Sequence, residues 1–133
     1  MKKLRPLLVV ILVCIFTACE KTDDSSISTS DRDKFLGNWN AISNGSGGQR
    51  NFQMTIVSSA SSPEGIIIKG FDGGSANSNL PANVSGNDLS IVTTVISGET
   101  ISGTGEMDGD TLRFDFSVFD GQTTEPRTCR AWK

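Results

Sequence analysis

The chain has 133 residues, of which 36% are hydrophobic and 20% are charged, and its formal net charge is −3. This length predicts a single domain. The sequence contains no His and no Tyr, so it lacks the commonest side-chain base and metal ligand. A net acidic chain disfavours nucleic acid as a partner. These features favour a non-catalytic protein, and we expect neither a cofactor nor a metal ion.

The first residues have the pattern of an export signal. Lys2, Lys3 and Arg5 form a basic start, an apolar stretch follows, and small residues precede Cys19. The apolar stretch is shorter than the roughly 20 residues that a membrane-spanning helix needs. This order of residues resembles the lipobox of bacterial lipoproteins, which implies cleavage after Ala18 and acylation of Cys19. A plain signal peptide and a membrane-spanning helix are the alternatives.

The lipoprotein resemblance divides the chain into a signal peptide (1–18), a lipidated Cys with a tether (19–32) and one domain (33–133). It implies a covalent anchor in the bacterial outer membrane. The tether is rich in Ser and Asp, and such a segment buries too little apolar surface to offset its ordering entropy. Its acidic start resembles the export signal of Bacteroidota surface lipoproteins, which implies display on the cell surface. An ordinary linker facing the periplasm is the alternative.

Removal of the signal peptide changes the charge and the cysteine count. It takes away three basic residues and no acidic residue, which leaves a net charge of −6. It also takes away Cys14, and Cys19 is expected to carry lipid, so Cys129 has no partner for an intrachain disulfide. We interpret Cys129 as a small buried hydrophobe, because a reactive thiol needs neighbours that lower its pKa.

From Phe35 onward the apolar residues follow a period of two, most clearly in 111–118. Pairs of Asn, Asp and Gly separate the apolar runs and predict hairpin turns. These pairs lie at 72–73, 87–88, 108–109 and 120–121. The expected strands are 35–43, 50–58, 64–71, 79–85, 88–97, 100–107, 110–119 and 123–132. Their short connections predict an all-β fold, a single antiparallel up-and-down barrel of about eight short strands, with no helix.

The first expected strand contains Gly37 and Trp39, which resemble the Gly-x-Trp of the lipocalin first strand. Together with the C-terminal residues 129–133, they make the domain resemble the small lipocalin-like lipoproteins of Bacteroidota. The resemblance implies that Trp39 closes one end of the barrel, and that a basic side chain, Arg130 or Arg127, packs over its ring. Lipocalins have longer strands, and a Trp that serves only as a core plug is the alternative.

A barrel of eight short strands encloses little space. We expect large side chains to fill most of it, namely Phe52, Ile56, Ile67, Ile91, Leu112, Phe114 and Phe116. A cavity would open at the end where Gly98, Gly103 and Gly105 remove side-chain volume. The alternative role of these glycines is to bend the strands.

Several residues are candidates for sites. The candidates for an apolar ligand surface are Trp39, Phe71, Phe119 and Trp132, each of which would also suit the core. Asp110-Thr111-Leu112 resembles the site that Bacteroidota O-glycosylate, which implies modification of Thr111. Asp108 and Asp110 could face one cation, but Ca²⁺ takes about six to eight oxygens, and turn formation explains both residues. We interpret Glu99 and Glu106 as solvated rather than as a glycosidase pair.

The sequence therefore predicts a non-catalytic binding or structural module on the cell envelope, not an enzyme. Its partner would be a small hydrophobic molecule, a glycan or a protein, in addition to the membrane reached through Cys19. A hydrophobic carrier requires a cavity of at least about 300 Å³. A carbohydrate-binding accessory predicts two aromatic faces exposed together. An enzyme inhibitor predicts a rigid protruding loop, such as 72–79.

Overall fold

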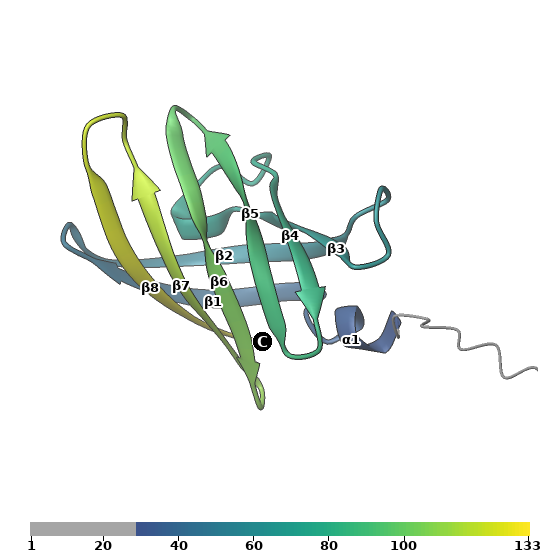
Figure 1. Cartoon of the computed structure of the whole chain (residues 1–133). Helices are drawn as coiled ribbons and strands as arrows, with labels where there is room; N and C mark the ends of the chain where they lie inside the picture. The colour runs from purple at the N-terminus through teal and green to yellow at the C-terminus, as the bar shows by residue number, and fades with distance from the viewer. Residues whose placement is uncertain (1–28) are drawn as a thin grey trace, which may run out of the picture.

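The structure, a computed structural model, describes residues 29–133, so the predicted signal peptide and Cys19 lie outside the described residues. Eight strands close into one barrel (Figure 1). Each strand pairs antiparallel with the next, and β1 pairs with β8. The strands are β1 (Gly37–Gly45), β2 (Gly48–Ser58), β3 (Gly65–Lys69), β4 (Leu80–Ser85), β5 (Asp88–Ile96), β6 (Glu99–Asp108), β7 (Thr111–Phe119) and β8 (Thr124–Trp132). The predicted up-and-down barrel is confirmed.

Two short helical segments were not expected from the sequence. The helix α1 (Thr29–Asp33) begins inside the segment predicted as tether, and the 3₁₀ turn η1 (Phe71–Gly73) follows β3. Both are too short to show a 3.6-residue period, so hydrophobic spacing could not have revealed them. No helix in residues 29–133 is both long enough and apolar enough to cross a membrane.

Successive side chains of a strand point to opposite faces of the sheet, so every second side chain points into the barrel. In β7, Leu112, Phe114 and Phe116 are buried, while Arg113 and Asp115 are exposed. The core takes side chains from all eight strands, from η1, and from Phe35 beyond the helix.

The prediction that Ile67 belongs to the core is wrong. In β3, Ile66 and Ile68 are buried, whereas Ile67 is only half-buried because it points to the opposite face. The three consecutive isoleucines carry no period of two, so the sequence could not tell which of them face inward. Pairing across the sheet fixes the register, which aligns Ile67 with Val57.

The glycines of β6 accommodate aromatic rings and do not open a cavity. Gly105 lies opposite Phe114, and a Cβ at this position would lie 2.9 Å from Phe114 Cδ1 and 2.9 Å from Leu89 Cγ. Gly103 lies opposite Phe116 in the same way, and a Cβ there would lie 2.6 Å from the Phe116 Cα. The space beside Gly103 and Gly105 is therefore filled, which corrects the expectation of a cavity at these two positions, whereas a Cβ at Gly98, in the turn between β5 and β6, would meet nothing within 4 Å.

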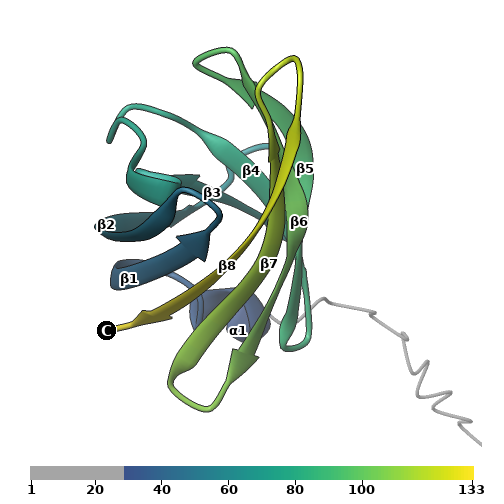
Figure 2. The ribbon, with the colours of Figure 1, turned by 90° about the vertical axis from the view of Figure 1, so that its left-hand side faces the viewer.

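Residues 29–39 close one end of the barrel, which we call the α1 end (Figure 2). Phe35 and Trp39 are buried in the core, and the Trp39 Nε1–H donates to the Phe35 carbonyl oxygen at 2.8 Å. Gly37 lies between them with φ +119°, a conformation that side chains rarely allow. The Gly-x-Trp sequence thus combines a backbone bend with an indole plug.

At the opposite end of the barrel, η1 folds inward. The Phe71 ring packs edge-on against Phe52, Phe114 and Phe116, with centroid distances of 6.3, 5.1 and 4.8 Å. The next residue, Asp72, is also buried. The Asp72-Gly73 pair is therefore not an exposed hairpin turn, and the sequence prediction at this point is wrong.

Adding one methyl group to Gly105 should destabilise the barrel. In Gly105→Ala the Cβ must displace the Leu89 and Phe114 side chains, and overpacking of this kind costs about 1–3 kcal/mol. Gly47→Ala is the matched control, because a Cβ there meets nothing within 4 Å. Urea unfolding should show a large loss of stability for the first variant only. Equal stability of the two variants would contradict the close packing at Gly105.

Candidate functional site

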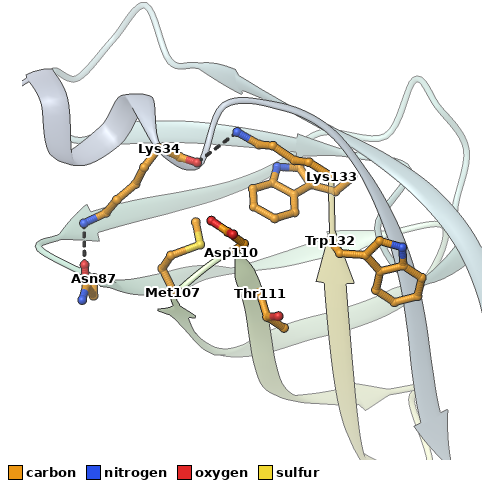
Figure 3. A pocket seen from close by; sticks show the side chains of 9 residues that line it. Lys34, Asn87, Met107, Asp110, Thr111, Trp132 and Lys133 are labelled. Atoms are coloured by element: carbon orange, nitrogen blue, oxygen red, sulfur yellow. Dashed lines mark hydrogen bonds between the residues drawn. The ribbon is translucent and has the colours of Figure 1, made fainter.

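A hollow of about 690 Å³ lies at the α1 end, beside the closed base of the barrel (Figure 3). Its walls combine ammonium, carboxylate, amide, thioether and indole groups. The lining residues are Lys34, Trp39, Asn87, Met107, Gly109, Asp110, Thr111, Trp132 and Lys133. We call it the α1-end hollow. Its mixed lining suits a polar ligand better than a purely apolar one.

Two lysines from opposite ends of the described chain meet at this hollow. The Lys133 ammonium donates to the Lys34 carbonyl oxygen at 3.2 Å, and its Nζ lies 4.8 Å from the centroid of the Trp39 ring. The Lys34 ammonium donates to the Asn87 side-chain oxygen at 2.6 Å. These contacts join the segment after α1, the end of β8 and the turn between β4 and β5 (Figure 3).

The cation over the Trp39 ring is therefore Lys133, and the prediction of Arg130 or Arg127 is wrong. Arg130 aligns with Ile42 and Arg113 and is exposed on the outer face. Arg127 points inward but lies nearer the other end of β8, where it contacts Asp72. Alternation along β8 sends residue 130 outward, so only the chain end can fold back over the indole.

A second hollow, of about 500 Å³, adjoins the first on the outer face of the barrel and is lined by Ile42, Asn44, Thr111, Arg130 and Trp132. Thr111 and Trp132 line both hollows. The Trp132 side chain is 41% exposed, and its indole points away from Lys34 and Asn87 (Figure 3). Trp132 thus forms a shared rim, and we call the two hollows together the Trp132 surface.

The four predicted ligand residues separate into two groups. Trp39 and Phe71 are buried in the core, whereas Trp132 and Phe119 are exposed. Phe119 aligns with Thr124, and Trp132 lies eight residues further along β8, about 26 Å away at the usual rise of a strand. The pair of adjacent aromatic faces expected of a carbohydrate-binding accessory is therefore not formed by these two residues.

The three residues whose hydrogen bonds cross the hollow are not predicted as site residues by the sequence. Lys34, Asn87 and Lys133 come from segments far apart in the sequence, and only barrel closure brings them together. Asn87 lies in the turn between β4 and β5, as the Asn-Asp pair predicts. No sequence spacing signals such a contact, because it depends on where strand ends meet in three dimensions.

Cys129 and Asp108 do not add reactive groups to the Trp132 surface. Burial, with a smaller effect of the Asp72 charge, raises the pKa of the Cys129 thiol to about 12, so the thiol stays protonated at neutral pH. The Asp108 carboxylate pairs with Arg113 at 3.0 Å on the exposed face. Within residues 29–133, no three His, Cys, Asp or Glu side chains gather as a metal site would require.

Comparison with known proteins identifies no family whose sequence model matches this chain, and no curated protein whose sequence matches it. The resemblance to lipocalin-like lipoproteins rests on the residues given for it above.

Proposed function

We propose that the chain is a lipid-anchored bacterial envelope protein whose barrel acts as a non-catalytic binding module. Its contact surface would be the Trp132 surface. The observation that carries this proposal is an exposed indole flanked by basic side chains, at the end of the barrel where the chain arrives from Cys19. The lipobox-like start and the Gly-x-Trp sequence support a lipocalin-like lipoprotein of the Bacteroidota type.

The length of the chain before α1 sets how far the barrel would lie from its anchor. Ten residue steps separate Cys19 from Thr29. A fully extended chain spans at most about 3.3–3.6 Å per residue, which gives a reach of about 35 Å. A lipidated Cys19 would therefore keep the α1 end, and with it the Trp132 surface, close to the outer-membrane surface. Acylation with several fatty chains makes such an anchor effectively permanent.

The barrel interior gives little support to a carrier of hydrophobic molecules. The Phe71 ring lies in edge-on contact with the rings of Phe114 and Phe116 inside it. The space beside the β6 glycines is filled by neighbouring atoms. A ligand-sized apolar cavity would require these side chains to leave. The two hollows of the Trp132 surface lie outside the filled interior, and polar as well as apolar groups line both of them.

Although it has one exposed indole and not the expected pair of aromatic faces, the Trp132 surface suits a glycan better than the other ligand classes. An exposed indole offers an apolar face for a sugar ring, and hydroxyl, amide and guanidinium groups surround it, from Thr111, Asn44 and Arg130. The inhibitor alternative has less support. The proposed inhibitory loop is held by Asp72 inside the barrel, which leaves 73–77 as its fully exposed part.

Replacing Cys19 should release the protein from the membrane. In a diderm bacterium fed radioactive palmitate, we expect the wild type and Cys14→Ser to be labelled and to sediment with the outer membrane. Cys19→Ser should be unlabelled and should leave the membrane fraction. Label that persists in Cys19→Ser would contradict the anchor, as would an unlabelled wild type.

Binding should depend on Trp132 and not on Phe119. The two side chains are 41% and 40% exposed, at opposite ends of the barrel, so Trp132→Ala and Phe119→Ala are matched variants. Of the two tryptophans, only Trp132 is accessible to iodide, because Trp39 is buried. Oligosaccharides from the host envelope should protect the fluorescence of the wild type and Phe119→Ala from iodide. They should also be retained in native mass spectra of these two proteins but not of Trp132→Ala. Equal retention by all three would rule out this surface.

A further inference from the structure

We propose that Arg127 forms a second binding site, at the barrel end opposite α1, which takes the carboxylate group of a small organic acid. The site would use the edge of the guanidinium group that carries Nε and Nη2. This inference does not depend on the lipid anchor or on the Trp132 surface, because it concerns the other end of the barrel.

The guanidinium group is buried and held in a fixed position. The Arg127 side chain is 2% exposed, and its Nη1 donates to the Asp72 carboxylate at 3.0 Å. Arg50 donates to the same carboxylate oxygen at 3.3 Å, and the Ser43 hydroxyl donates to the other oxygen. Asp72 therefore holds Arg127 through Nη1 alone, and the Nε and Nη2 donors of Arg127 point away from this carboxylate.

Those remaining donors form one edge of the group. Nε and Nη2 are buried and donate to no group among residues 29–133. Their N–H bonds are parallel and form a planar fork that matches the two oxygens of a carboxylate. Leaving buried charged donors unpaired is costly, so an acceptor that fills this fork would gain more than a surface contact does.

The fork faces a position without a side chain. Continuing the register of β1 and β8 past Asn44 and Thr128 places Gly45 opposite Arg127. A Cβ at position 45 would lie 2.8 Å from Arg127 Nε and would also collide with Glu125 Oε1. Gly45 thus leaves space beside the fork, at the rim formed by the hairpin between β1 and β2, and the Glu125 carboxylate occupies part of that space.

Glu125 is the internal competitor for this fork. Its Oε1 lies 4.0 Å from Arg127 Nε, too far for a hydrogen bond, because it accepts the Gly47 N–H at 3.2 Å instead. That hydrogen bond lowers the pKa of the Glu125 carboxyl group, which is therefore ionised at neutral pH. A bound carboxylate would lie beside this negative charge, so removing the charge should tighten binding.

The charge of the cluster favours a monoanion. Arg50 and Arg127 supply two positive charges, and Asp72 and Glu125 supply two negative charges. A carboxylate adds one further charge and presents two oxygens in one plane, whereas phosphate adds up to two charges near Glu125. We therefore assign the site to a carboxylate, with inorganic phosphate as the comparison.

The test is an NMR titration of the 133-residue protein in a neutral detergent, observing the Arg127 Nε–H and the backbone amides of Gly45 and Gly47. The probes are sodium acetate, sodium octanoate and sodium phosphate, with sodium chloride at equal ionic strength as the control. We expect saturable shifts with acetate and octanoate that chloride does not produce, and weaker shifts with phosphate. Tighter binding of octanoate than of acetate would show that apolar groups beside the fork add to the affinity.

Three variants make the assignment specific. Glu125→Gln keeps a carbonyl oxygen for the Gly47 N–H and should bind the probes about two- to fivefold more tightly, since it removes one like charge. Arg127→Lys keeps the charge but lacks the fork, and its Gly45 and Gly47 amides should not respond. Arg113→Lys changes an exposed arginine on the outer face and should behave as the wild type.

Two results would overturn the proposal. One is an Arg127 Nε–H signal that acetate and octanoate shift no more than chloride does, which would mean that solvent alone satisfies the fork. The other is unchanged affinity in Glu125→Gln, which would place any bound carboxylate elsewhere. Because Glu125 is on the rim and its replacement leaves the Asp72 pair intact, this second result stands even if Arg127→Lys fails to fold.

Discussion

The buried carboxylate of Asp72 is the constraint on which the rest of the barrel depends. It accepts hydrogen bonds from Ser43 in β1, Arg50 in β2 and Arg127 in β8, and so ties η1 to three strands. Its backbone has φ +52°, a left-handed conformation that Asp tolerates better than most residues. This connection holds the neighbouring Phe71 in the core, where its ring contacts three other phenylalanines.

The filled interior determines where the protein can bind anything. Because aromatic rings occupy the centre, polar groups available for recognition lie at the two ends and on the outer face. The ends are closed by different means. At the α1 end, Lys133 caps the Trp39 ring in a cation–π contact, which contributes about 0.5–1 kcal/mol at an exposed site. At the other end, η1 contributes the buried Phe71 ring and the buried ion pair of Asp72 with Arg127.

The sequence predicts those features whose signal lies in neighbouring residues, and it misses those that depend on contacts between distant segments. The strands could be predicted because alternating apolar and polar residues, and Asn, Asp or Gly at turns, occur in consecutive positions. The strand β7 and the turn after it are an example. Ile67 was misplaced because a run of three isoleucines has no alternation. Lys133 and Asp72 were missed for a different reason: their partners lie far away in the chain, and only closure of the barrel brings them into contact. Cys19 lies outside the described residues, so its lipidation remains a prediction from sequence.

The role of Asp72 can be measured most directly by a double-mutant cycle with Arg127, followed by urea unfolding. Asp72→Asn keeps the shape and the tolerance for a left-handed backbone but removes the charge that balances Arg127, and Arg127→Met removes the partner. Breaking a buried pair from one side costs about 3–5 kcal/mol. We predict that each single variant loses this much stability, and that the double variant loses less than the two losses combined, by at least about 1 kcal/mol. Single losses below about 1 kcal/mol that simply add would contradict the account, because Asp72 would then not hold η1 in the barrel.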